Sequence, residues 1–259
     1  MSKYLIKGAS LYGEKVADIL IEDGVISRIA ENIDAADAQV VEAAGQVALP
    51  GLVDIHTHLR QPGYEASETV ETGTRAAALG GYTAVFAMAN SMPVADTAAV
   101  VEQVDRLGKE SAWCRVQPIG AVTVGLKGER LSDIGGMANS TANVRVFSDD
   151  GMCVYDPAVM RRALEYVKTF DGVIAQHAQE PRLTEGAQMN EGKVSADLGL
   201  TGWPAVAEEA IIARDVLLAE HLDSKLHICH LSTKGSIEVV RWAKSRGVKV
   251  TAEATPHHL

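Results

Sequence analysis

Apolar residues come in short runs bounded by charged residues over the first part of the chain. Residues 17–22 and 25–30 are two such runs, and Asp23-Gly24 between them is a dipeptide typical of hairpin turns. This spacing predicts a small β-sheet. Because no His or Cys occurs before residue 47, we expect this segment to serve packing and not chemistry.

From Val47 onward the pattern changes, and short β-rich runs alternate with stretches of helical periodicity. Such alternation is typical of parallel α/β folds. The seven predicted strands are residues 52–56, 82–88, 115–122, 143–147, 172–176, 225–229 and 248–253. No glycine-rich phosphate-binding motif follows any of them, which argues against a dinucleotide or P-loop nucleotide site.

Helical periodicity is clearest in three places. Asp156-Pro157 has the form of an N-cap followed by a proline in the first turn, and apolar residues then recur at helical spacing up to Val167. Residues 203–222 predict a second helix, whose apolar stripe comprises Val206, Ala210, Ala213, Leu217 and Leu218. The third helix has a stripe of Ile237, Val240 and Ala243 and is expected to stop at Gly247.

Composition narrows the class of protein. The 259 residues include 24 Lys and Arg against 34 Asp and Glu, and 47% are hydrophobic, as in a folded acidic enzyme. Without a basic run, nucleic acid and anionic membranes are poor candidates for the main partner. The longest uncharged stretch, residues 76–95, contains Gly and Pro and does not predict a membrane-spanning helix. We expect the protein to reside in a reducing cytoplasm, because its three cysteines are scattered, no CxxC motif occurs and no signal peptide is recognised.

Residues capable of chemistry fall at or just beyond the carboxyl ends of the predicted strands. They are His56, His58, Asn90, Asp150, His177 and His230. In a (β/α)8 barrel the active site is built at that face from several strand ends, whereas a doubly wound sheet binds its ligand at one switch point. The distribution therefore predicts a barrel of the TIM type.

The strongest local motif is Asp54-Ile55-His56-Thr57-His58. Side chains two residues apart on a strand point to the same side, so His56 and His58 can converge on one metal ion. His177 and His230 supply enough further nitrogen ligands for a second ion. His227 has the opposite strand parity to His230, and we predict that it serves packing.

A site with two metal ions usually needs a bridging anion, because the ions lie about 3.5–4 Å apart and repel each other. Asp149 and Asp150 in Phe147-Ser148-Asp149-Asp150-Gly151 are both candidates, and strand alternation alone does not choose between them. The other aspartate would then serve as a cap or as a hydrogen-bond partner.

Two further residues could hold a substrate near the metal ligands. Arg60 lies two residues after His58 and would share its side if the extended backbone continued, so that its guanidinium could bind a carboxylate. Asn90 could hydrogen-bond an amide or a carboxylate, although a turn residue before Pro93 is an equally simple interpretation.

In this order and spacing, the segments DIHTHLRQPG, AMANSMPV, FSDDG, QHAQE, HICHLST and EATPHHL resemble the dihydroorotases of the amidohydrolase superfamily, in particular the long bacterial type. The resemblance extends over essentially the whole chain. It implies a zinc enzyme of de novo pyrimidine biosynthesis that interconverts (S)-dihydroorotate and N-carbamoyl-L-aspartate. Its fold would be a (β/α)8 barrel over residues 47–259, preceded by the N-terminal half of a small β-sandwich domain over residues 1–46.

The resemblance also implies roles for the candidate residues. His56 and His58 would hold one of two Zn2+ ions per subunit, His177 and His230 would hold the other, and Asp150 would bridge them. Substrate carboxylate would be bound by Arg60 and Asn90, with His58 at the edge of the pocket. No lysine stands near Asp149-Asp150, which favours the branch of the family with a bridging aspartate over the branch with a carboxylated lysine.

The length of the chain leads to one further expectation. The catalytic aspartate of the family follows an eighth barrel strand, and only seven strands are predicted before Leu259. We therefore expect a fragment of a longer dihydroorotase that is inactive by itself, with its general base beyond Leu259. Alternatives are a hydantoinase or allantoinase, and a non-catalytic partner of aspartate carbamoyltransferase. A homodimer is a further possibility.

Overall fold

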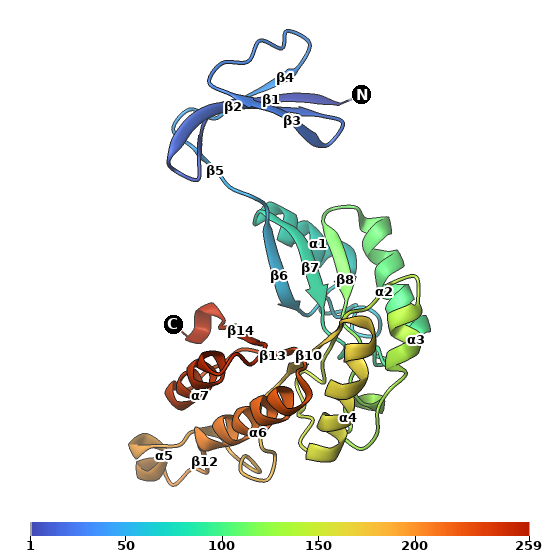
Figure 1. Cartoon of the computed structure of the whole chain (residues 1–259), viewed down its shortest axis with the longest axis vertical. Helices are drawn as coiled ribbons and strands as arrows, with labels where there is room; N and C mark the ends of the chain where they lie inside the picture. Colours follow the sequence, from blue (N-terminus) through green and yellow to red (C-terminus); the bar gives the residue numbers. More distant parts are fainter. Residues whose placement is uncertain (1, 259) are drawn as a thin grey trace. The chain divides into compact units, whose positions relative to one another are not determined.

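The computed structural model describes residues 2–258, which form two compact units, Met1–Gly51 and Leu52–Leu259 (Figure 1). The first unit is a five-stranded sheet, and its central strand is β1. Its strands are β1 (Lys3–Leu11), β2 (Lys15–Glu22), β3 (Val25–Ala30), β4 (Gln39–Glu42) and β5 (Val47–Ala48). The order is β3-β2-β1-β4, and β5 pairs with β1 beyond the end of β4.

The predicted hairpin joins β2 and β3, and Asp23 and Gly24 both have positive φ, as a tight two-residue turn requires. A small core of Leu5, Leu20 and Ile33 lies under the sheet. Because β5 pairs with β1, residues beyond the predicted boundary at residue 46 still belong to this unit. The membership of residues 1–46 in a β-sandwich domain stays a prediction.

The second unit contains the seven predicted parallel strands in chain order. They are β6 (Leu52–Thr57), β7 (Tyr82–Ala87), β8 (Arg115–Pro118), β9 (Val146–Phe147), β10 (Val173–Gln176), β13 (Leu226–Ile228) and β14 (Val250–Ala252). They form a three-stranded sheet, β6-β7-β8, and a four-stranded sheet, β9-β10-β13-β14. A parallel bridge between Gly120 and Phe147 joins the two. The prediction of a parallel barrel is thereby confirmed.

Helices cover the outer side of these strands, as expected for βαβ units (Figure 1). α1 packs against β7, α2 against β8, α4 against β10, α6 against β13 and α7 against β14. The α-helices are α1 (Val70–Leu79), α2 (Ala98–Ser111), α3 (Ile134–Asn139), α4 (Pro157–Val167), α5 (Lys193–Leu198), α6 (Val206–Leu222) and α7 (Lys234–Ser245). Three 3-10 turns, η1 (Val124–Leu126), η2 (Lys168–Phe170) and η3 (Pro256–His258), and a two-stranded ladder of β11 (Met189–Asn190) and β12 (Gly202–Trp203) complete the unit.

Helix α4 begins as predicted, since the Asp156 carboxylate accepts hydrogen bonds from the Ala158 and Val159 amides and Pro157 occupies the first turn. Helix α6 corrects the prediction in two respects. It begins at Val206 and not at Trp203, and the predicted stripe is wrong because Val206, Ala210 and Leu217 are exposed.

The buried face of α6 lies one position further along and includes two acidic residues, Glu208 and Asp215. The Glu208 carboxylate accepts hydrogen bonds from the backbone amides of Ser232 and Thr233, at the start of α7. Asp215 is paired with Arg214 and accepts a hydrogen bond from Gln176. A carboxylate can be buried when it accepts hydrogen bonds from other segments of the chain. A prediction from hydrophobicity alone therefore places these two residues on the exposed face of the helix.

Inside the ring of strands, a small apolar cluster of Met88, Ile119, Ala175 and Cys229 fills the space below the strand ends. A larger core between the strands and the helices contains Phe147, Ile174, Leu226 and Ile228. Together the two layers fix the carboxyl ends of the strands, where the candidate residues lie. None of the helices in the described residues combines the length and the apolar character needed to cross a membrane.

Candidate metal centre

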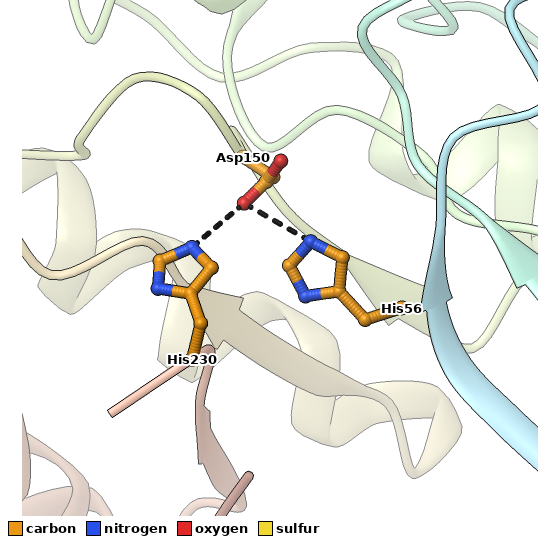
Figure 2. A group of neighbouring side chains, drawn as sticks. All are labelled: His56, Asp150 and His230. Atoms are coloured by element: carbon orange, nitrogen blue, oxygen red, sulfur yellow. Dashed lines mark hydrogen bonds and ion pairs between the residues drawn. The ribbon is translucent and has the colours of Figure 1, made fainter. Parts of the chain in front are cut away.

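Four histidines and one aspartate converge at the carboxyl ends of the strands. His56 is the second-to-last residue of β6, and His58 directly follows that strand. Asp150 follows β9, His177 directly follows β10, and His230 follows β13. Figure 2 shows His56 and His230 pointing from opposite sides toward the carboxylate of Asp150. We call these five residues the imidazole cluster.

The Asp150 carboxylate is at the centre of the cluster. Its Oδ1 atom lies 3.1 Å from His230 Nε2, 3.4 Å from His56 Nε2 and 3.4 Å from His177 Nδ1. Its Oδ2 atom lies 3.3 Å from His58 Nε2. Every imidazole therefore presents one ring nitrogen to the same carboxylate.

These separations fit a metal site. Two ligand atoms bound at 2.0–2.1 Å to a tetrahedral zinc ion lie about 3.3 Å apart. Imidazole nitrogen and carboxylate oxygen are also the donors that zinc binds. The described residues thus hold a group of side chains with the spacing and chemistry to bind a metal ion.

The electrostatics of the cluster arise from the same contacts. Burial opposes ionisation of Asp150, but hydrogen bonds from His177, His230 and His56 outweigh it and hold the pKa of this carboxyl well below its ordinary range. Burial likewise opposes the charge on His56, yet Asp150, Cys229 and Glu253 raise the pKa of His56 to about 12. The pKa of His58 is lowered, mainly by burial.

The neighbouring aspartate faces a different environment. Asp149 is buried, and its Oδ1 atom accepts hydrogen bonds from the backbone amides of Val122 (2.8 Å) and Thr123 (3.0 Å). Its other oxygen accepts one from the Thr123 hydroxyl. We call Asp149 and these donors the loop nest. Of the two candidates that the sequence left open, Asp150 lies among the imidazoles, and Asp149 ties down the loop after β8.

In three of the histidines, the ring nitrogen that faces away from Asp150 donates a hydrogen bond to an acceptor oxygen. His58 Nδ1 lies 3.0 Å from Asn90 Oδ1, and His177 Nε2 lies 3.0 Å from Gln179 Oε1. His56 Nδ1 lies 2.5 Å from Glu253 Oε1. Such partners fix which nitrogen of a ring is available to a metal ion.

The two predicted substrate-binding residues lie beside the cluster in different ways. Arg60 is exposed and has a φ of 58°, so the extended backbone does not continue to it and the register argument for its direction was wrong. Its charge still acts on His58 and helps to lower the pKa of that ring, after the larger effect of burial. The Asn90 carboxamide accepts from His58 and donates to the Asp150 backbone carbonyl at 3.5 Å.

His227 packs inside the ring of strands, as predicted, and hydrogen-bonds through Nδ1 with Thr251 Oγ1 at 2.8 Å. The alternation that separates it from His230 ends at Ile228, and His230 takes a positive φ of 33°. The direction of His230 therefore comes from the loop after β13 and not from strand register.

Sequence reasoning missed Glu253 and Gln179. Glu253 directly follows β14, so the strand-end rule that found the histidines also points to it. Gln179 lies two residues after His177 in a non-repetitive loop, where no periodic signal marks it.

Comparison with known proteins gives the family. A model of the family described as "Dihydro-orotase-like" matches residues 45–236. The dihydroorotase of Streptomyces coelicolor is 70% identical over 259 residues, which cover 100% of this chain and 60% of that protein. The dihydroorotase of Mycobacterium tuberculosis is 54% identical over 257 residues, which cover 98% of this chain and 60% of that protein.

Solved structures give the same fold at low identity. The L-hydantoinase (dihydropyrimidinase) from Arthrobacter aurescens superposes with a TM-score of 0.82 at 20% identity, covering 100% of this chain and 59% of that one. For dihydropyrimidinase from Brevibacillus agri the TM-score is 0.79 at 22% identity, covering 99% of this chain and 58% of that one. The chain spans about 60% of the length of the curated relatives named above. With a family match over most of its residues, the chain belongs to the dihydro-orotase-like family.

Proposed function

We propose that this chain carries the metal-binding part of a dihydroorotase, which interconverts (S)-dihydroorotate and N-carbamoyl-L-aspartate in de novo pyrimidine biosynthesis. The observation that carries the proposal is a contrast in identity. The two dihydroorotases reported above are 70% and 54% identical over nearly the whole chain, whereas the two hydantoinase-type structures share the fold at 20% and 22% identity. On a common fold, the higher identity points to the substrate class of the dihydroorotases.

In this proposal the metal ions are two zinc ions per subunit. His56 and His58 would hold one ion, His177 and His230 the other, and Asp150 both. Support comes from the nitrogen atoms of all four rings, which face the two oxygens of Asp150 at 3.1–3.4 Å. When bound, zinc would supply a water molecule that ionises near neutral pH and would polarise the ring amide carbonyl.

The residues of the chain itself would bind and orient the substrate. The Arg60 guanidinium has no ion pair among the described residues, so it is available for a bidentate contact with the substrate carboxylate. Asn90 and His58 would line the same pocket, with Asn90 also holding the His58 ring. Fixing the ring by its carboxylate turns binding energy into orientation of the amide.

The test measures the metal content of the purified chain and compares substrates on a protein that contains this chain at the full length of the curated relatives. We expect bound zinc in both, and hydrolysis of dihydroorotate by the longer protein with little turnover of hydantoin or allantoin. Preference for hydantoin or allantoin would support the second candidate function, a hydantoinase-type activity, which the structural likeness favours.

A non-catalytic partner of aspartate carbamoyltransferase would bind no zinc, and the presence of all five ligand candidates speaks against it. Size-exclusion chromatography with and without that enzyme would separate a homodimer from a mixed assembly. A cytoplasmic location goes with this proposal and would be checked by cell fractionation.

A further inference from the structure

Glu253 stands behind the imidazole cluster, on the side of His56 that faces away from Asp150. It directly follows β14, and its side chain is 15% exposed. Its Oε1 atom lies 2.5 Å from His56 Nδ1 and accepts a hydrogen bond from the His230 backbone amide at 3.3 Å. Its Oε2 atom faces His227 Nε2 at 3.3 Å. Oε1 is thus hydrogen-bonded within the protein, and Oε2 lies near a buried ring nitrogen of His227 that has no hydrogen-bond partner among the described residues.

The contact with His56 determines which ring nitrogen is available. A nitrogen that donates its proton to a carboxylate has no lone pair left for a metal ion. With Nδ1 donating to Glu253, the lone pair belongs to Nε2, which is the atom 3.4 Å from Asp150. Glu253 and Asp150 therefore bind the two opposite edges of one imidazole.

The three partnered histidines differ in the charge of the partner. His58 and His177 donate to neutral carboxamides, those of Asn90 and Gln179. His56 alone among these three donates to a carboxylate. A carboxylate makes the ring a stronger base, and hence a stronger ligand, than an amide does.

The position of Glu253 in the fold adds a second consequence. β6 and β14 are the first and last strands in the order of the seven, and no ladder joins them. The hydrogen bond between His56 and Glu253 links these two strands directly. His227, held by Thr251 at 2.8 Å, faces the other oxygen of Glu253 at 3.3 Å.

His56, Cys229 and Glu253 also lie close enough together to suggest a second metal site. The 2.5 Å separation of His56 and Glu253 argues against that alternative, since two ligands of one zinc ion lie about 3.3 Å apart. The distance is shorter than the value of about 2.7–2.9 Å that is usual for a charge-assisted N–H···O bond, and it fits a short hydrogen bond better than shared coordination of one ion.

We propose that Glu253 is a positioning residue of the metal centre, which holds His56 with Nε2 toward the metal ion and strengthens metal binding. The inference rests on the proposed function only in requiring that the imidazole cluster binds zinc. It requires no particular substrate.

The first test measures zinc affinity of the full chain by competition with a chromophoric chelator. Glu253→Gln keeps the shape and one acceptor oxygen but removes the charge, and we expect affinity to fall about 10–100-fold. The matched control is Glu238→Gln on α7, an exposed glutamate at which the same chemical change should leave affinity as in the parent protein. Equal affinity of both folded variants would overturn the proposal.

A second measurement does not depend on how well the variant folds. In the zinc-loaded parent protein with 15N-labelled histidine, long-range 1H–15N spectra report which nitrogen of each ring carries a proton. We expect the proton of His56 on Nδ1, with its signals assigned by their loss in His56→Asn. A proton on Nε2 would refute the inference. Absence of zinc from the parent protein would instead reject the proposed function.

Discussion

Asp149 and Asp150 are neighbours in the chain, and their carboxyl groups have opposite surroundings. In the loop nest, Asp149 is satisfied by backbone amides and a hydroxyl, all from Val122 and Thr123. In the imidazole cluster, Asp150 faces four ring nitrogens from three different segments, the ends of β6, β10 and β13. The first carboxylate completes its bonding within the fold, whereas the second draws together groups that a metal ion can share.

The pKa values of the two carboxyl groups are shifted in opposite directions, in line with these surroundings. Burial of Asp149 outweighs its hydrogen bonds and raises its pKa to about 6, whereas the imidazoles hold the pKa of Asp150 far below its ordinary value. The comparison teaches that residue type and position in a strand-end motif do not assign a role. The partners that the fold brings to each carboxylate assign it.

The largest expected effect comes from Asp150→Asn. Removing one partner of a buried charged group costs about 3–5 kcal/mol, so we expect zinc affinity to fall by more than about 100-fold. The measurement is chelator competition on the full chain, with circular dichroism as the check of folding. If Asp150→Asn bound zinc as the parent protein does, the imidazole cluster would not be the metal site.

Asp149→Asn should lower the stability of the fold and leave zinc affinity nearly unchanged. The neutral amide cannot accept from three donors as the carboxylate does, and hydrogen bonds to charged groups contribute about 1.5–3 kcal/mol each. We expect the free energy of unfolding to fall by about 3 kcal/mol in urea denaturation with chelator present. Zinc affinity of the folded variant should stay within about threefold of the parent value, a difference of under 1 kcal/mol. A loss of affinity as large as that of Asp150→Asn would abolish the distinction between the two aspartates.

The sequence predicted the seven parallel strands because their apolar runs alternate with helical stretches, and it predicted the four histidines because they lie at or just beyond the strand ends. It could not choose between Asp149 and Asp150, since β9 ends at Phe147 and strand alternation has no meaning beyond that residue. For the same reason the direction of Arg60 was argued from a register that its positive φ interrupts. Loop geometry, which depends on distant partners, accounts for these gaps.

Helix α6 and Glu253 show a second limit. Predicting the buried face of a helix from a hydrophobic stripe assumes that charged residues face water. Glu208 is buried nevertheless, because it accepts hydrogen bonds from backbone amides at the start of α7. The sequence does not mark Glu253 although it follows a strand directly, because its partner His56 lies 197 residues away in the chain. Both acidic residues have roles that appear only when segments distant in sequence are placed together.

A smaller effect should follow from Thr123→Val, which removes one donor from the loop nest and keeps the side-chain shape. The variant loses the hydrogen bond to the Asp149 carboxylate and also the one that the hydroxyl accepts from the Gly128 amide at 2.9 Å, which predicts a decrease of about 2–3 kcal/mol in the free energy of unfolding. Thr123→Ser retains the hydroxyl and is the matched control, expected to recover most of the loss. If the two variants were equally unstable, the methyl packing of Thr123, and not its hydroxyl, would be what stabilises the nest.

The smallest effect concerns Asp18 of the N-terminal unit, where backbone amides again surround a carboxylate but no imidazole does. The amides of Gly8 (2.8 Å) and Ile33 (3.0 Å) donate to it and lower its pKa below the ordinary value of 3.8. A folded-state pKa below the unfolded one contributes stability that is present above pH 3.8 and is lost as the pH falls through the folded-state pKa.

We therefore expect the amide proton shifts of Gly8 and Ile33 to titrate together in NMR spectra, with a midpoint below pH 3.8, and this step to disappear in Asp18→Asn. A midpoint above pH 3.8 would mean that burial outweighs the amides at Asp18, as it does at Asp149. A midpoint below it would show that the two amide donors outweigh burial at Asp18.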